Sequence, residues 1–515
     1  MAIDPKHLPD DPKILQQMVL DLMTQLERES SERGKIESLL RELLDAKRNR
    51  KSEQLSDDQL ALFAAAWQAR QTETKSAEMS PASDHDDQDG AASGAGADAP
   101  KKKAGGRQPL PPHLKRERVL HDLAESEKHC STCQQDLRPI GEESSERYEY
   151  IPAQLIVIED VCKKYACECT IRTATKPSQP IQKSTAGASL LAQVIVAKCA
   201  DHLPLNRQEK IFERHGVDIS RKTMCDWLAE CSDLLQSLYI AAKEVLFQSK
   251  VIGTDDTSVK VLDGKLPFAR TGRIWPYYGD NEHPVILYDY TATRERAGPE
   301  QFLKGYRGHL QVDAYAGYDA FFKDPARGLI EIGCWAHARR YFYKALGSDQ
   351  GRMGPALLLI AQLYRVEKHG RVLVAADRLR LRQLESQPIL EKIHKYLLEM
   401  ETEVLPKSPE GRAVRYTLKN WTALTRYAAD GDLEIDNNAT ERSIRGVAVG
   451  RNNWLFFGSD RGGKTAAVLR SFVASCQRAG RDPFAWFKDI LTRIADHPVT
   501  RIAELLPHNW APAKP

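Results

Sequence analysis

The segment VIGTDDTSVKVL, residues Val251–Leu262, decides the fold of this chain. Its apolar residues alternate as they do in a half-buried strand, and the Asp263-Gly264 pair that follows is a strong hairpin signal. Two further strand-like segments come next, Arg273–Tyr278 (RIWPYY) and Pro284–Tyr290 (PVILYDY). The pattern therefore predicts a meander of three strands.

Helices and strands alternate beyond this meander. We expect a short helix over Gly298–Tyr306, a strand over His309–Val312, a strand over Leu329–Trp335 and a helix over Ala336–Leu346. A three-stranded meander followed by helix, strand, helix, strand and helix is the chain order of a ribonuclease-H-like domain. In that fold the first and fourth strands lie side by side at the centre of the sheet.

Three carboxylates stand at informative places in this order. Asp255 and Asp313 end the first and fourth strands, and Glu441 lies one turn into a helix that starts at an Asp-Asn-Asn sequence. Each has an ordinary alternative: a polar strand end for Asp255, a helix cap near Tyr315 for Asp313, and a capping box from Asn438 for Glu441. Three carboxylates on separate elements are what a two-metal phosphoryl-transfer site needs, and their order here favours that interpretation.

Basic residues surround the glutamate. Arg442 and Arg445 follow it on the same helix, and Arg451 lies just past the expected end of that helix. A carboxylate flanked by arginines suits a site that holds a metal ion against a phosphate backbone. An apolar strand and a glycine-rich turn are expected after the helix.

The glycine-rich turn GSDRGGKT, residues 458–465, satisfies the formula of a nucleotide-binding phosphate loop. Only 50 residues follow Thr465, they are predicted to form helix and tail, and no strand ending in Asp occurs among them. A nucleotide-binding domain needs several parallel strands after such a loop. Arg451, Arg461 and Lys464 are therefore interpreted as contacts to DNA phosphates rather than to ATP.

Five strings, three of which contain aromatic residues, carry a resemblance to a known family. They are Thr254–Thr257 (TDDT), Leu310–Tyr318 (LQVDAYAGY), Cys334–Arg340 (CWAHARR), Asp436–Arg442 (DNNATER) and Gly450–Trp454 (GRNNW). Through them nearly the whole chain resembles the transposases of the insertion sequence 66 group, often labelled TnpC. The resemblance implies a DDE transposase whose catalytic positions are Asp255, Asp313 and Glu441. Asp256 stands where relatives usually carry Glu, and Asp255 is the expected metal ligand of the pair.

The segment after the fifth strand holds two features. Cys334-x-x-His337 resembles a string found at this place in several DDE transposase groups, so both residues are candidate accessory residues; the alternative is a small buried Cys and a helix-capping His. From Gly354 to Tyr427 the chain has the periodicity of amphipathic helices. A helical insertion there would explain the distance in sequence between Asp313 and Glu441.

Cysteine usage predicts a structural zinc site. The chain has ten Cys and its polar start, MAIDPKHLPDDP, is no signal peptide, so reduced thiols are expected. Cys130 and Cys133 form a metal knuckle, and their natural partners are Cys167 and Cys169, in a region that resembles the zinc-ribbon-like part of the family. Cys162 and His129 are substitutes, and the alternative is free or disulfide-forming cysteines.

The segment after this module is a helix-turn-helix candidate. Helices are predicted over Leu205–Arg214, with Pro204 at the start, and over Ser220–Cys231, with Ser220 as N-cap. Residues at the second helix start would face DNA; they are Arg221, Lys222 and Thr223. An ordinary helical hairpin is the alternative.

The N-terminal region contains a heptad pattern and a linker. The two seam positions are occupied by Leu15, Leu22, Ile36 and Leu43, and by Val19, Leu26 and Leu40, which predicts a coiled coil and self-association, with a two-helix hairpin as the alternative. Residues 76–100 lack Lys and Arg and are rich in Asp, Gly, Ala and Ser, as flexible linkers are. The basic cluster Lys101–Arg107 could enter a minor groove or simply end the linker.

The expected fold is therefore multidomain α+β: an N-terminal coiled coil, a zinc-binding module, a helix-turn-helix-like region and a ribonuclease-H-like α/β catalytic domain with a helical insertion. The boundaries are 1–70 for the coiled-coil oligomerisation region, 71–116 for the linker with its basic cluster, 117–180 for the zinc-binding module, 181–245 for the helix-turn-helix-like region, 246–350 and 431–480 for the two parts of the catalytic domain, 351–430 for the insertion and 481–515 for a C-terminal tail.

The expected function is that of a bacterial insertion-sequence transposase, which binds terminal inverted repeats and catalyses DNA strand cleavage and strand transfer. Two Mg²⁺ (or Mn²⁺) ions at Asp255, Asp313 and Glu441 and one structural Zn²⁺ are implied. Expected partners are DNA at the repeats and the target, further copies of the chain and accessory proteins of the same element. No apolar run could span a membrane, so a cytoplasmic, nucleoid-associated protein is expected. The alternatives are an inactive zinc and helix-turn-helix regulator or an ATP-binding transposition helper.

Overall fold

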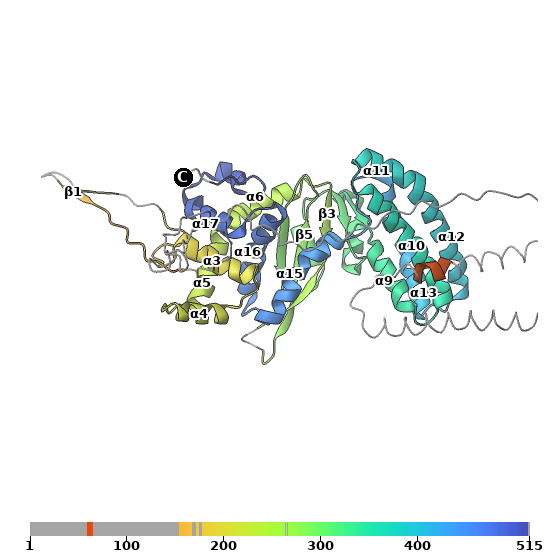
Figure 1. Cartoon of the computed structure of the whole chain (residues 1–515), viewed down its shortest axis with the longest axis horizontal. Helices are drawn as coiled ribbons and strands as arrows, with labels where there is room; N and C mark the ends of the chain where they lie inside the picture. Colours follow the sequence, from red (N-terminus) through yellow and green to blue (C-terminus); the bar gives the residue numbers. More distant parts are fainter. Residues whose placement is uncertain are drawn as a thin grey trace, which may run out of the picture. The chain divides into compact units, whose positions relative to one another are not determined.

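The computed structural model of this chain describes residues 59–64, 154–166, 171–174, 178–262, 264 and 266–512. The chain divides into two compact units, one formed by Ser80–Thr173 and the other by Met1–Met79 with Ala174–Pro515. In the described part of the smaller unit, two short strands, β1 (Lys164–Ala166) and β2 (Ile171–Thr173), pair antiparallel. The larger unit contains the main sheet and its helices (Figure 1).

The main sheet has six strands. They are β3 (Val251–Thr254), β4 (Thr257–Val261), β5 (Arg270–Tyr278), β6 (Ile286–Thr291), β7 (Gly308–Gln311) and β8 (Leu329–Ile332). β3 and β4 lie one after the other along one edge of β5, and β6 pairs with its other edge, all antiparallel. β7 pairs parallel with β3, and β8 pairs parallel with β7. The order across the sheet is therefore β6, β5, β3 with β4, β7, β8.

The meander, the parallel pair and the adjacency of the first and fourth strands are as expected, but two strand predictions are wrong. The first strand is not continuous over Val251–Leu262, because the chain leaves the ladder at Asp255 and Asp256. The fifth ends at Ile332 rather than at Trp335, because Trp335 already begins a helix. Asp255 and Asp256 therefore lie outside the sheet between β3 and β4, and Cys334 lies outside it between β8 and the next helix.

Alternate residues of the sheet enter two cores, as the two-residue period of a strand requires. Trp275, Tyr277 and Leu287 lie in the core shared with the helices that precede the sheet. Ile274 and Tyr288 point to the opposite face, into the core beneath the glutamate helix. Both faces of the sheet are therefore covered.

The helices around the first core precede the sheet, connect its strands or follow it. They are α3 (Ala188–Cys199), α4 (Leu205–Arg214), α5 (Arg221–Leu234), α6 (Gln236–Leu246), α7 (Ala297–Phe302), α8 (Asp319–Phe322) and α17 (Pro483–Arg493). The helix predicted over Leu205–Arg214 has those bounds, and the side chain of Ser220 caps α5 by accepting the backbone N–H of Thr223. The helix expected over Gly298–Tyr306 is shorter and ends at Phe302.

The C-terminal residues are not a loose tail. Asp482 caps α17, and Trp486, Phe487, Ile490 and Leu491 are fully buried against the first core, where α17 packs on α3. Those four apolar residues at helical spacing were the signal for this helix in the sequence.

The helical insertion forms a core of its own beside the open end of the sheet (Figure 1). Its helices are α9 (Trp335–Ala345), α10 (Gln350–Gly370), α11 (Ala375–Leu381), α12 (Gln387–Glu403), α13 (Pro409–Lys419) and α14 (Trp421–Thr425). Residues 59–64 are helical and place the buried ring of Phe63 on Gly354 of α10. These helices lie between β8 and the Glu441 segment, where the sequence predicted helices. Of the region expected to be a coiled coil, all but residues 59–64 lies outside the described residues.

Two long helices follow the insertion: α15 (Asn438–Trp454), which carries Glu441, and α16 (Asp460–Arg478). α15 packs across β3, β4 and β5, whereas α16 runs along β6. Two serines of α16 bond to the backbone of β6: Ser471 accepts the N–H of Tyr288, and Ser475 accepts the N–H of Ile286 and donates to its carbonyl. The outer edge of the sheet is therefore covered by side-chain hydrogen bonds.

The strand predicted between these helices is absent from this described segment. α15 extends to Trp454, Leu455 adopts a left-handed conformation that ends it, and Phe457 forms a single bridge to Val261. Because β4 stops at Val261, a longer pairing has no partner strand there.

The loop that matches the phosphate-loop formula is mostly helix. α16 begins at Asp460, so the amide of Gly462 bonds to the side chain of Ser459, and that of Gly463 to its carbonyl. A Cβ on Gly463 would lie 2.6 Å from the ring of Tyr290, so this glycine permits close packing of α16 on β6. The amides that would cradle phosphates are used by the helix itself.

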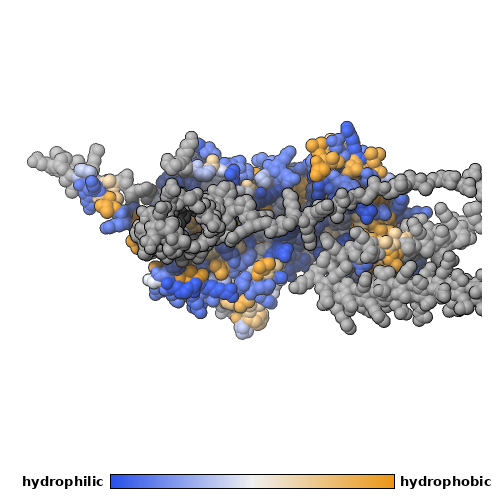
Figure 2. All heavy atoms as spheres, viewed as in Figure 1, coloured by the Kyte–Doolittle hydropathy of each residue, from blue (hydrophilic) through white to orange (hydrophobic). Residues whose placement is uncertain are grey.

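Exposed apolar residues gather at one end of the helical insertion. Figure 2 shows apolar residues gathered over the end of the insertion that contains α11, where Val372, Val374 and Leu384 are 68–89% exposed. Among the described residues, no helix is both long and apolar enough to cross a membrane.

Candidate active site

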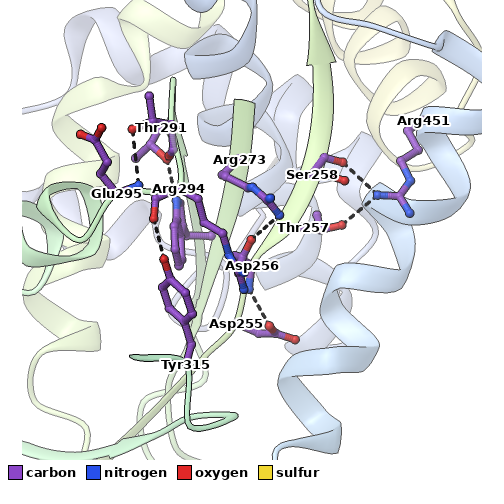
Figure 3. Close-up of polar contacts among 12 residues, drawn as sticks. Asp255, Asp256, Thr257, Ser258, Arg273, Thr291, Arg294, Glu295, Tyr315 and Arg451 are labelled. Atoms are coloured by element: carbon purple, nitrogen blue, oxygen red, sulfur yellow. Dashed lines mark hydrogen bonds and ion pairs between the residues drawn. The ribbon is translucent and has the colours of Figure 1, made fainter. Parts of the chain in front are cut away.

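The break between β3 and β4 separates two neighbouring carboxylates with different surroundings. The side chain of Asp256 is only 4% exposed and accepts hydrogen bonds from Arg273 at 2.7 Å and from Arg294 at 2.7 and 2.9 Å (Figure 3). Two guanidinium groups therefore neutralise Asp256 and hold it in place.

Asp255 lies among other carboxylates instead. Its Oδ1 accepts the backbone N–H of Asp256 at 2.6 Å. Burial, followed by the charge of Asp313 and, more weakly, that of Glu441, raises the pKa of Asp255 to about 7. The structure thus brings together the three carboxylates predicted from separate elements, and their negative charges repel one another.

Asp313 reaches this place because β7 runs parallel to β3. Parallel neighbours end at the same edge of a sheet, and Asp313 follows β7 as Asp255 follows β3. Its Oδ1 accepts the backbone N–H of Tyr315, and its carbonyl accepts the hydroxyl of Tyr416 at 3.2 Å. Ala314 between them has φ +62°, a left-handed conformation that Ala rarely adopts. Strained backbone of this kind persists where surrounding contacts hold it, often at functional sites.

Glu441 is positioned by the start of α15. Asn437, 1% exposed, donates its side-chain amide to the carbonyl of Thr254 at 2.9 Å and its backbone N–H to the sulfur of Cys334. The helix start is therefore tied to the end of β3 and to the start of α9. A Cβ on Gly253 would overlap the hydroxyl of Thr440, so a glycine in β3 is needed for this approach.

The capping-box alternative for Glu441 does not hold. The N-cap of α15 is Asn437, with no side-chain cap, so Glu441 lies beyond the third helical position. Its carboxylate instead lies 3.6 Å from Nδ1 of His337 and 3.8 Å from Arg340.

Cys334, His337 and Glu441 form a second group of potential ligands. One donor atom from each lies within 4.8 Å of the others, a condition that Asp255, Asp313 and Glu441 do not meet together in the described structure. His337 Nδ1 and Glu441 Oε1 are buried without hydrogen-bond partners. Sulfur, imidazole and carboxylate donors suit zinc, whereas carboxylates alone suit magnesium. Burial raises the pKa of Cys334 to about 12, so this sulfur is a thiol unless a metal binds.

Comparison with known proteins identifies the family of this chain. The family model described as "Transposase IS66 family" matches residues 183–465, which include all three carboxylates. The chain belongs to the IS66 transposase family. An "IS66 C-terminal element" matches residues 471–508, a "zinc-finger binding domain of transposase IS66" residues 127–170, and a "Transposase C of IS166 homeodomain" residues 36–119.

Three relatives of this transposase come from Sinorhizobium fredii (strain NBRC 101917 / NGR234), and each is called an uncharacterized protein. One, y4hP, is 34% identical over 78% of this chain and 77% of its own length. Another, y4jD, is 30% identical over 99% of this chain and 98% of its own length. A third, y4qI, is 32% identical over 81% of this chain and 80% of its own length. The resemblance inferred from the sequence strings is confirmed.

The zinc-finger match supports Zn²⁺ in this transposase. It spans Cys130, Cys133, Cys167 and Cys169, all of which lie outside the described residues, as does His129. Cys162, between them, is a partly exposed free thiol. The family and its zinc-finger and helical domains imply DNA as a partner.

The residues expected to contact DNA have varied environments. At the start of α5, Arg221 is ion-paired with Glu209 of α4, Lys222 is exposed, and the hydroxyl of Thr223 contacts that of Ser220. On α15, Arg442 and Arg445 are exposed.

The basic residues near the start of α16 differ in the same way. Arg451 is bound within the protein, donating to the hydroxyl of Thr257 and the carbonyl of Ser258 (Figure 3). Arg461 forms an exposed ion pair with Asp233, and Lys464 is exposed. Arg451 thus fastens α15 to β4, a role that local sequence did not indicate.

Sequence reasoning missed the residues that hold the carboxylates in place. Arg273 and Arg294 are 17 and 38 residues from Asp256, and nothing local marks them. Asn437 was within the Asp-Asn-Asn string, but its bond to Thr254 spans 183 residues. The need for a glycine at position 253 was visible only as a glycine within a predicted strand, which is a known sign of close backbone approach.

Proposed function

We propose that this protein is a DDE transposase that cuts DNA at the ends of its element and joins the freed 3′ ends to a target. The observation that carries the proposal is the convergence of three carboxylates: Asp255 follows β3, Asp313 follows the parallel neighbour β7, and Glu441 lies on α15, which packs on β3. Such a cluster is unfavourable without a cation, because burial and mutual repulsion oppose ionisation. Carboxylate oxygens are the ligands that Mg²⁺ prefers.

The topology supports a ribonuclease-H-like interpretation of the sheet. An antiparallel meander, β6, β5 and β3 with β4, is continued by two parallel strands, β7 and β8. Two carboxylates end the central parallel pair, and the third arrives on a helix that crosses the same strands. The helical insertion fills the gap in sequence between the second and third.

The residues present fit a pair of divalent ions. Asp255, Asp313 and Glu441 would hold two Mg²⁺ or Mn²⁺, which would activate the attacking water or 3′-hydroxyl and stabilise the leaving oxygen. Oε1 of Glu441 is buried and unbonded, so it has a free coordination position. Asp256, paired with Arg273 and Arg294, keeps the β3–β4 break in place and has little charge left for an ion.

The other modules would supply DNA recognition and assembly. We propose that Cys130, Cys133, Cys167 and Cys169 hold one structural Zn²⁺. Lys222 and the start of α5 are proposed to contact the terminal repeats together with this zinc-binding module. The predicted N-terminal coiled coil would pair copies, because two element ends must be handled together.

The test is cleavage of the DNA ends that flank the protein's own gene. Asp255→Asn, Asp313→Asn and Glu441→Gln should each abolish Mg²⁺-dependent cleavage while end binding, measured by fluorescence anisotropy, stays within about twofold, since phosphate contacts remain. Asp377→Asn, an exposed carboxylate of the insertion, is the matched control. Normal cleavage by one variant would remove that residue from the site. End binding by the wild-type chain without any cleavage would instead favour a regulator.

A further inference from the structure

A cavity of about 320 Å³ opens beside α15, away from the carboxylates. Its walls are Ala439, Arg442, Ser443 and Gly446 of α15, together with α16, β5, β6 and the turn after α3. Glu441 does not line it, because neighbouring helix residues point about 100° apart. One helix thus presents Glu441 to the carboxylate cluster and Arg442 to the cavity.

The cavity is positively charged. Arg442, Arg470 and Arg478 line it, and no carboxylate is among its lining residues. Arg478 is occupied, since it donates to the carbonyls of Asp280 and Val285 and lies 3.9 Å from the ring of Tyr278. Within the described structure, Arg442 and Arg470 have no carboxylate at ion-pair distance. Two guanidinium groups therefore face the cavity without a counter-charge.

His202 adds an unsatisfied group to the same wall. Its backbone has φ +59°, a left-handed conformation that His, like Asn and Asp, adopts more readily than most other residues do. Its Nδ1 is buried with no hydrogen-bond partner. Burial, followed by the charge of Arg470, lowers the pKa of His202. A buried polar nitrogen without a partner is rare in proteins and indicates a missing ligand or water.

Two glycines of α15 make room for these groups. A Cβ on Gly446 would lie 2.7 Å from the guanidinium of Arg470. A Cβ on Gly450 would lie 3.1 Å from Nδ1 of His202 and 3.4 Å from Arg470. The helix therefore packs directly against the arginine and the histidine, and side chains at these two positions would displace them.

We infer that this cavity binds one phosphate group of the DNA strand, held between Arg442 and Arg470 with His202 at its edge. Guanidinium groups match the geometry of phosphate oxygens and form charge-assisted hydrogen bonds with them. Since Glu441 and Arg442 are adjacent on α15, the bound phosphate would lie near the one that is cut and would set the register of the strand. The inference rests on the proposed function in taking DNA as the ligand and Glu441 as part of the cleavage site.

The experiment measures binding by the full-length protein, without added divalent metal, to a fluorescent duplex that carries one end of its own element. Single phosphates are replaced in turn by uncharged methylphosphonates, and a further pair of duplexes differs only in a 5′-phosphate. Wild-type protein should lose about tenfold in affinity at one or two replaced positions, or on removal of the 5′-phosphate. The two arms identify an internal or a terminal phosphate as the ligand.

Variants show whether that loss belongs to this cavity. Arg470→Gln and Arg442→Gln should each bind the natural duplex about tenfold more weakly and should no longer respond to the sensitive replacement. Arg470→Lys keeps the charge and should respond partly. Arg380→Gln, which removes an exposed charge on α11, should bind and respond as the wild type does.

Two results would overturn the inference: no sensitive phosphate in the wild type, or full sensitivity retained in Arg470→Gln and Arg442→Gln. Because Arg442 is exposed, its variant tests the cavity even if Arg470→Gln does not fold. Asp255→Asn should show the same sensitive phosphate as the wild type. If the protein fails to cleave DNA, a sensitive phosphate in the binding experiment still supports the cavity. If no phosphate is sensitive, cleavage by the three carboxylates is still possible.

Discussion

Asp255 and Asp256 are chemically identical neighbours with opposite environments. Asp256 is paired with two arginines, whereas Asp255 is buried beside Asp313 and Glu441. Burial and the neighbouring like charges disfavour the ionised carboxylate of Asp255 and raise its pKa, whereas Asp256 is held by its two cations. The side chain that an incoming cation would stabilise most is therefore Asp255.

This difference predicts a pH-dependent stability. The folded chain keeps the proton of Asp255 up to about pH 7, whereas an unfolded Asp loses it near pH 4. Between these values the folded state binds more protons, so the free energy of unfolding should fall as pH rises from 4 to 7. In magnesium-free buffer, Asp255→Asn should stabilise the protein by about 2–4 kcal/mol at pH 8 and by almost nothing at pH 4.

Calorimetric melting of the two proteins at both pH values checks this prediction. Asp377→Asn, on the surface of the insertion, should melt like the wild type throughout. An Asp255→Asn variant no more stable than the wild type at pH 8 would show that Asp255 is already ionised there.

His337 is the nearest imidazole to the proposed catalytic glutamate. Its Nδ1 lies 3.6 Å from Glu441, and its Nε2 lies 3.4 Å from Arg340. Residues that orient a metal-binding side chain typically contribute 10–100-fold to activity or metal affinity. His337→Ala should therefore cut cleavage by about 10–100-fold and raise the Mg²⁺ concentration needed for half-maximal rate, with DNA affinity unchanged.

His369→Ala, an exposed histidine of α10, is the control for that experiment. An unchanged Mg²⁺ requirement in His337→Ala would mean that His337 does not position the glutamate.

At the scale of elements, the approach of α15 to β3 depends on one missing side chain. Gly253→Ala places a methyl group against Thr440 and 2.9 Å from the side chain of Asn437. Overpacking of this kind costs about 1–3 kcal/mol. Here the clash with Thr440 would be relieved by a shift of α15, the helix that carries Glu441. Cleavage should fall by at least about tenfold, more than the loss of stability explains.

Adding Thr440→Ala to Gly253→Ala removes the closest clash and should restore part of the activity. Gly264→Ala, in an open turn where no atom lies within 4 Å of the added methyl group, should be silent. Equal activity of Gly253→Ala and Gly264→Ala would contradict the proposed role of this contact.

The glycine-rich turn gives a second prediction at this scale. Gly463→Ala should destabilise the protein by about 1–3 kcal/mol, because the methyl group would press on Tyr290 of β6. Lys464→Ala should leave both the melting temperature and nucleotide binding unchanged, since Lys464 is exposed and the turn is helical. Micromolar ATP binding that Lys464→Ala abolishes would reinstate the phosphate loop.

Strands and helices were predictable from the sequence where the apolar residues repeat with a local period, or where the order of elements is that of a known fold. The parallel pairing of β3 and β7 brings Asp255 and Asp313 together, and both strands were visible in the sequence as apolar runs that end in Asp. The interruption between β3 and β4 and the arginines that hold it were not predictable. Arg273 and Arg294 are two of 74 basic residues, and only the folded sheet selects them as partners of Asp256.

At the scale of the whole molecule, the two compact units should respond differently to zinc. The zinc-finger match lies in the unit formed by Ser80–Thr173, apart from the sheet and its helices. Metal analysis should find about one zinc per chain. Cys130→Ser with Cys133→Ser should abolish zinc binding and specific end recognition, because the metal supplies much of the folding energy of such a module.

The larger unit should keep its fold in that double variant. Its melting transition and any Mg²⁺-dependent, non-specific nicking should persist, since the cores found among the described residues are built from residues of the larger unit. Zinc-free wild-type protein, or unchanged end recognition by the double variant, would show that these cysteines are not ligands.

The serines that cover β6 also have a consequence in time. Ile286 is synthesised 189 residues before Ser475, which at 5–20 residues per second is a delay of roughly 10–40 s. Throughout that interval the outer strand has no covering helix, and a nascent chain with a bare strand edge is prone to aggregate. A gene copy truncated ahead of Asp460 would thus encode a chain that holds all three carboxylates but cannot stay dispersed in the cell.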